Sequence, residues 1–214
     1  MYAVADTLPY SMEVDQLMHQ VSAKIDQGLP IEDETIWVNL LKLEPYRMHH
    51  RVQETVKIWV DKSAKKISNQ RSSGQAALTS LQSVSQAYHA RDFEKTVQEC
   101  KKILSQTPKH LDIRSNMALA LMHLNKDLCA QIELEIVVKL SETHIPAMLN
   151  LTVVYEKANR RKDAENMASK LSQIAGSKNL DVPLIRHNVA WYHLQNGDYR
   201  YADTLLIQKN QGVR

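Results

Sequence analysis

The sequence predicts an all-α protein in which one helix–turn–helix unit recurs. Residues that break helices are scarce, with five Gly and six Pro among 214 residues. A chain this poor in breakers, and without alternating β-branched runs, is typical of helical proteins. The second observation is a regular spacing. Three asparagines are each followed by an alanine at the same distance along the chain: Asn116 by Ala130, Asn150 by Ala164 and Asn188 by Ala202. A recurrence of this kind indicates stacked copies of one supersecondary unit.

The unit is clearest near the C-terminal end of the sequence. A helix is expected over residues 184–194, followed by a turn in which Gly197 can take the positive φ that ends a helix. A second helix then carries the small Ala202 where two helices must cross closely. Residues 77–110 follow the same order, with a turn at Ala90-Arg91-Asp92-Phe93, and Pro108 closes their second helix.

These residues resemble the tetratricopeptide repeat family, whose unit is about 34 residues long. The stretches 90–108 and 195–206 match the family best, and the resemblance covers residues 77–209. It implies a right-handed superhelix with units at about 77–110, 111–144, 145–178 and 183–214. The sequence departs from the family's pattern at five positions of the first two units: Ser80, Ser83, Val84, Thr96 and Asp127.

A small helical region is expected ahead of the repeats, over residues 1–70. Ser11 is a good N-cap for a helix that ends at Gly28 and Pro30, and further helices are expected over 33–43 and 45–67. None of the three shows the spacing of the repeat. We therefore expect a separate region joined by a linker at 71–76, and the alternative is a cap packed on the first repeat.

The second helix of the second unit, about residues 128–140, is strongly apolar, with Leu128, Ile132, Leu134, Ile136, Val137, Val138 and Leu140. A helix that packs on one side only normally keeps a polar face. Its excess of Leu, Ile and Val predicts that it is covered on more than one side.

Composition excludes several classes of function. The net charge of +3 is too small to predict nucleic-acid binding. No stretch reaches the ~20 apolar residues of a membrane span, and no signal peptide is visible, so a soluble, cytoplasmic chain is expected. Cys100 and Cys129 fall in the second helices of successive units, and Cys100, at an apolar helix position, is expected to be a buried free thiol. The sequence carries no catalytic or metal-binding motif, and we expect neither an enzyme nor a cofactor.

The candidate site is a row of side chains on the first helix of each unit. Stacked units turn these helices toward one concave face. Asn116, Asn150 and Asn188 would form a ladder, since an amide both donates and accepts hydrogen bonds and can hold a peptide group of an extended ligand. The resemblance to the tetratricopeptide repeat family also implies that Asn at this helix position binds the backbone of a peptide ligand. The full set of expected partner-binding residues is Asn116, Leu119, His123, Asn150, Val153, Lys157, Asn188, Trp191 and Gln195.

The expected function is a non-enzymatic scaffold that binds an apolar or mixed segment of a partner protein in the concave face. Two alternatives stay open. One is a chaperone or escort for a secreted or assembling protein that dimerises through residues 10–67. The other is a regulatory module of a larger protein. The alternative to a binding ladder is that the asparagines bond to neighbouring helices or turns.

Overall fold

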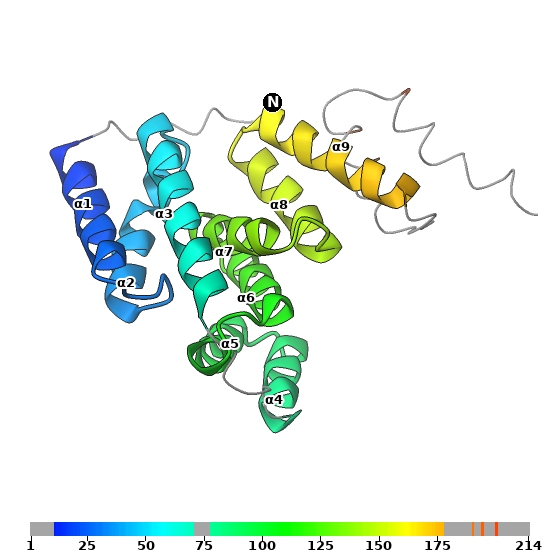
Figure 1. Cartoon of the computed structure of the whole chain (residues 1–214), viewed down its shortest axis with the longest axis horizontal. Helices are drawn as coiled ribbons and strands as arrows, with labels where there is room; N and C mark the ends of the chain where they lie inside the picture. Colours follow the sequence, from blue (N-terminus) through cyan, green and yellow to red (C-terminus); the bar gives the residue numbers. More distant parts are fainter. Residues whose placement is uncertain (1–10, 71–77, 178–189, 191–193, 195–199, 201–214) are drawn as a thin grey trace, which may run out of the picture. The chain divides into compact units, whose positions relative to one another are not determined.

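The computed structural model describes residues 11–70 and 78–177, together with residues 190, 194 and 200 (Figure 1). All regular secondary structure in these ranges is helical, which confirms the all-α fold class. The contacts divide the chain into two compact units, Met1–Glu142 and Thr143–Arg214. Each unit is described by itself below.

The first unit begins with the three expected N-terminal helices. These are α1 (Met12–Asp26), α2 (Glu34–Leu43) and α3 (His50–Asn69), with a short 3-10 helix η1 (Glu44–Tyr46) between α2 and α3. The third helix starts later than expected because Glu44–Tyr46 forms this separate turn. Trp59 is fully buried between the helices, and its indole N–H donates to Ser22 Oγ at 2.9 Å.

Two helical hairpins complete the first unit. They are formed by α4 (Leu78–His89) with α5 (Phe93–Gln106) and by α6 (Leu111–His123) with α7 (Asp127–Leu140). From α4 to α7, each helix packs on the next one in the sequence. The second unit contains a third hairpin, α8 (Ile145–Lys157) with α9 (Arg161–Ser177), and the fully buried Ala164 lies in α9. The fourth repeat, expected at 183–214, falls almost entirely outside the described residues.

The same turn closes the first helix of every described hairpin. Arg91, Asn125 and Asn159 are evenly spaced along the chain and have φ of 58°, 56° and 55°. In each turn the N–H of the next residue reaches back to a carbonyl of the helix, as in the Schellman motif. These bonds are Asp92 to Ala87 at 3.0 Å, Lys126 to Leu121 at 2.9 Å and Arg160 to Tyr155 at 2.8 Å. The repeat length expected from the sequence is therefore present in the backbone.

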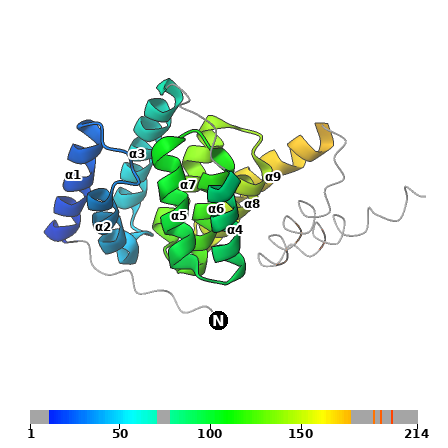
Figure 2. The same cartoon turned by 90° about the horizontal axis from the view of Figure 1, so that it is seen from below.

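Helix α7 is covered by the N-terminal helices as well as by its own hairpin. It packs on α6, on α3, on α2 and on η1. Figures 1 and 2 show α3 lying alongside it. Leu128, Leu134 and Ile136 are fully buried, which confirms that this helix is covered on more than one side. The division between the two contact units falls after Glu142.

Candidate protein-interaction face

Three of the expected binding residues share one face of α6. Asn116 and His123 are exposed, and Leu119 between them is half-buried. Their spacing of three and four residues places them on one stripe of the helix. The neighbouring Met117 and Ala118 point into the core and are fully buried. The stripe is therefore the side of α6 that remains open.

The side chains at the equivalent positions on α4 and α8, the first helices of the other described hairpins, are likewise exposed or half-buried. On α4 they are Gln82, Ser85 and His89, and all three are exposed. On α8, in the second unit, Asn150 and Val153 are half-buried and Lys157 is exposed. The remaining expected residues, Asn188, Trp191 and Gln195, lie outside the described residues.

His123 belongs to an aromatic cluster that sequence reasoning did not find. Its ring stacks on Phe93, with ring centroids 4.3 Å apart and planes 8° from parallel. The hydroxyl of Tyr88 lies 3.2 Å from His123 Nε2 and shares a hydrogen bond with it. The sequence indicates an aromatic residue in the α4–α5 turn, but its contact here is with the following hairpin, far along the chain. The cluster fixes the ring of His123 at the edge of the open stripe.

The open stripe of the first unit carries no Lys, Arg, Asp or Glu at the six equivalent positions of α4 and α6. They hold Gln82, Ser85, His89, Asn116, Leu119 and His123. Amides, a hydroxyl and imidazoles can hydrogen-bond a peptide backbone without demanding a charged side chain from it. This face is chemically suited to a segment of low charge.

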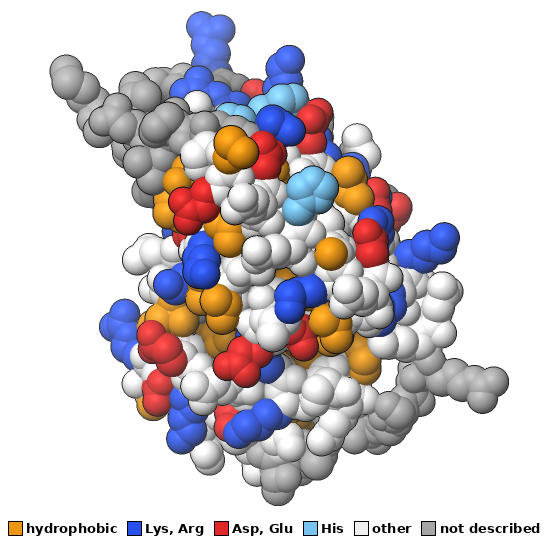
Figure 3. All heavy atoms as spheres, turned by 90° about the vertical axis from the view of Figure 1, so that its left-hand side faces the viewer, with side chains coloured by type: hydrophobic (Ala, Val, Ile, Leu, Met, Phe, Trp, Pro, Cys, Tyr) orange, Lys and Arg blue, Asp and Glu red, His pale blue; other side chains and the backbone are white. Residues whose placement is uncertain are grey.

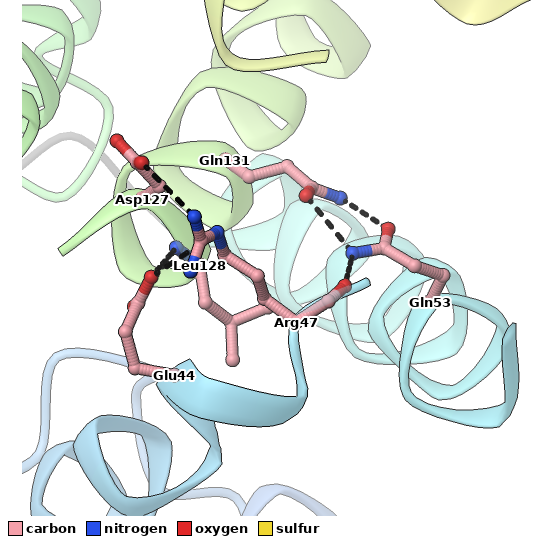
Figure 4. A network of polar contacts seen from close by, with 6 residues as sticks. All are labelled: Glu44, Arg47, Gln53, Asp127, Leu128 and Gln131. Carbon is pink, nitrogen blue, oxygen red and sulfur yellow. Dashed lines mark hydrogen bonds and ion pairs between the residues drawn. The ribbon is translucent and has the colours of Figure 1, made fainter. Parts of the chain in front are cut away.

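The opposite side of this unit is closed by a polar network between the N-terminal helices and α7 (Figure 4). The carboxylate of Glu44 accepts from the N–H of Leu128 with both oxygens, at 3.1 and 3.0 Å. Arg47 Nε lies 3.7 Å from Glu44 Oε1, and Arg47 Nη2 lies 3.8 Å from Asp127 Oδ2. Burial raises the pKa of Glu44 to about 7, against the lowering effect of the Leu128 N–H and of Arg47. Glu44 thus caps a helix that has no side-chain cap of its own.

A pair of glutamines continues this network. Gln131 donates to Gln53 Oε1 at 2.8 Å, and Gln53 donates in return to Gln131 Oε1 at 3.2 Å. Both side chains are buried, so each amide satisfies a group that would otherwise lose its hydrogen bond to water. Polar side chains of α3 and α7 therefore hydrogen-bond each other, and α3 covers this side of α7.

The described residues contain neither a metal-binding cluster nor a membrane-spanning helix. Within residues 11–70 and 78–177, no group of three or more His, Cys, Asp or Glu side chains is placed to hold a metal ion. None of the helices in the described part of the chain is both long enough and apolar enough to cross a membrane.

Comparison with solved structures identifies the fold. No protein-family model matches the sequence, and no curated protein does. A tetratricopeptide repeat protein from Parabacteroides merdae is similar in structure, with a TM-score of 0.51 and 12% sequence identity, over 92% of this chain and 78% of that one. The MamA RS-1 ArsTM double mutant has a TM-score of 0.46 and 12% identity, over 92% of this chain and 93% of its own. Together with the turn that returns at a constant interval, the first of these matches shows that the chain has a tetratricopeptide-repeat-like fold.

Proposed function

We propose that this chain is a non-enzymatic scaffold that binds an extended segment of a partner protein. The segment would lie on the open face formed by the first helix of each repeat. The observation that carries the proposal is the contrast between the two sides of the first unit. The side formed by α7 is covered by α2 and α3, while Asn116 and His123 on α6 are exposed. Helical repeat proteins commonly use their concave surface for binding.

The chemistry of the face indicates the kind of segment. Asn116 and Asn150 can each exchange two hydrogen bonds with one peptide group, and Leu119 and Val153 offer apolar contact one turn further along. The proposed ligand is an extended, largely uncharged segment with apolar side chains. Each amide contact should contribute about 0.5–1.5 kcal/mol to binding.

Photo-cross-linking tests where such a segment binds. Peptides would be selected by display against the full chain, and a photoreactive phenylalanine would replace Leu119 or Val153. The matched control is the same replacement at Gln98, an exposed residue on α5. We expect cross-links from positions 119 and 153 and none from 98. Cross-linking that is strongest from position 98 would show that the segment binds elsewhere.

A second proposal is an escort protein that dimerises through residues 10–67. Its support is that the large apolar residues exposed by more than a third in the described chain, Met12, Val38 and Ile58, lie on α1, α2 and α3. On the face drawn in Figure 3, however, apolar side chains are interspersed with acidic and basic ones. Sedimentation velocity on the full chain and on Ile58→Lys tests this proposal. A dimer that becomes a monomer in the variant supports it, and a monomer in both cases removes it.

A further inference from the structure

A buried cluster of three charged side chains joins the N-terminal region to the second repeat. Arg114 of α6 is fully buried, and its Nη1 contacts both Glu133 of α7 and Glu32, which precedes α2. Its Nη2 donates to the carbonyl of Pro108 at 3.2 Å. The side chain of Glu133 is 0% exposed and that of Glu32 is 13% exposed. Two carboxyl groups thus meet one guanidinium in the interior.

The charges of this cluster do not balance when both carboxyl groups are ionised. One guanidinium neutralises one carboxylate, and an unpaired charge in a buried place is strongly disfavoured. Glu133 Oε1 and Arg114 Nε have no hydrogen-bond partner. Two carboxyl groups that share a site disfavour the doubly ionised state, because their like charges repel each other.

Other ionisable groups face the cluster from each element around it. Lys101 on α5 attracts Glu133 and Glu32, but its Nζ lies over the ring of Trp37, 3.7 Å from the centroid. Glu34 at the start of α2 also attracts Lys101. The thiol of Cys129 on α7 is fully buried, and burial raises its pKa well above the ordinary value, so it stays neutral. The lysine partly offsets the excess negative charge and is shared among several acids.

We propose that Glu32, Arg114 and Glu133 form a proton-dependent latch that holds the segment preceding α2 onto α6 and α7. With one proton taken from solvent by the carboxyl pair, the cluster contains one cation, one anion and one neutral acid. At higher pH the proton returns to solvent, and two carboxylates then face one guanidinium. Glu32, the more exposed of the two, then leaves the cluster and loosens the docked segment.

The direction of the pH effect follows from the buried acid. Burial raises the pKa of Glu133 to about 7, although Arg114 opposes this. A glutamate in the unfolded chain has a pKa of about 4.3, so between these values the folded state binds the proton more tightly. The latch is therefore tightest at acidic pH, weakens as the pH rises from about 4.3 to about 7, and changes little at higher pH.

Hydrogen exchange on the full chain tests the latch. The measured quantity is the protection of amides in residues 31–36, corrected for intrinsic exchange, at pH 6 and pH 8. Because one proton is linked to docking, the protection should fall about tenfold between these values in the wild type. In Glu133→Gln and in Glu32→Gln the charges balance without a proton, and the fall should be about twofold or less. In the double variant, Arg114 has no carboxylate, and protection should be low at both pH values.

Controls separate this effect from a general loss of structure. Amides of α9 report on the second contact unit and should show no such change. Glu44→Gln, which alters a different carboxyl group, the one that caps α7, should keep the tenfold fall. An equal fall in the wild type and in Glu133→Gln would overturn the proposal. Should the variants fail to fold, a 13C titration of the Glu133 carboxyl in the wild type decides: a midpoint near 7 supports the latch, and one near 4.5 overturns it.

Discussion

Arg91, Asn125 and Asn159 show how single residues set the repeat. All three hold the left-handed conformation that ends the first helix of a hairpin. This conformation favours glycine and tolerates asparagine, but it is strained for a long side chain. The sequence offered a glycine for this role only at Gly197, so the structure shows that the turn survives without one.

Replacing Arg91 with glycine should stabilise the protein. The side chain is exposed, so little contact is lost, and relief of the strained φ should add about 0.5–1 kcal/mol to the free energy of unfolding. Chemical denaturation of the full chain would measure this. Arg91→Asn should give a smaller gain, and Arg91→Ala should give none. A lower stability for Arg91→Gly would mean that the arginine side chain, and not the backbone, holds the turn.

Glu44 is a residue whose role could not be predicted from local sequence. It caps α7 from a position 84 residues earlier in the chain, and Glu32 reaches Arg114 across 82 residues. Periodicity and turn signals report on neighbours within one or two helical turns. Contacts between charged residues so distant in sequence are determined by packing of whole helices, and the sequence pattern carries no sign of them.

Removal of this cap should destabilise the first unit. Glu44→Ala leaves the N–H of Leu128 buried without an acceptor, and the expected cost is about 1–2 kcal/mol. Glu54→Ala on α3 is the matched control, because that glutamate is exposed and pairs with the exposed His50. Thermal unfolding followed by circular dichroism compares the two. Equal melting temperatures for Glu44→Ala and Glu54→Ala would contradict the capping role.

At the scale of helices, most of the architecture follows from the sequence. The expected start of α2 agrees with the structure to within one residue. The start of the third helix was missed because Pro45 suits the first turn of either a 3-10 helix or an α-helix. The excess of apolar residues on α7 correctly indicated a second covering layer, but it could not say that α2 and α3 supply it.

The packing of α8 against α9 leads to a prediction at the scale of helices. Ala164 is fully buried where the two helices pack. Ala164→Leu should overpack this crossing and lower the free energy of unfolding by about 1–3 kcal/mol. The control is Asn166→Leu, two residues further along α9 and exposed. An unchanged denaturant midpoint for Ala164→Leu would show that the crossing is placed elsewhere.

For the whole molecule, the N-terminal helices determine how the first unit is covered. They lie in one contact unit with the first two hairpins, and they cover α7. Deleting residues 1–71 should therefore expose the apolar side of α7. We expect the fragment 72–214 to associate and to lose its cooperative unfolding, whereas a fragment of residues 11–142 should unfold cooperatively. Sedimentation and denaturation of both fragments would measure this. A monomeric, cooperatively folding 72–214 fragment would show that α1–α3 are an independent addition.

The candidate site is less predictable from the sequence than the fold. The register of Asn116, Leu119 and His123 on one open stripe agrees with the expected helix face, since helical periodicity determines it. The stacking of Phe93 on His123 was not foreseen, because it depends on how two successive units meet. The chemistry of a partner depends on the sum of such contacts, which no single repeat contains.

The dissociation constant of a display-selected peptide is the most direct test of the proposed binding face. It would be measured by calorimetry for the full chain, for Asn116→Ala with Asn150→Ala, and for the control Asn166→Ala. Loss of two amide contacts should raise the constant about tenfold or more, with an unchanged melting temperature. The control should bind like the wild type. An unaltered dissociation constant in the double variant, or a fall in binding and stability together, would contradict the account.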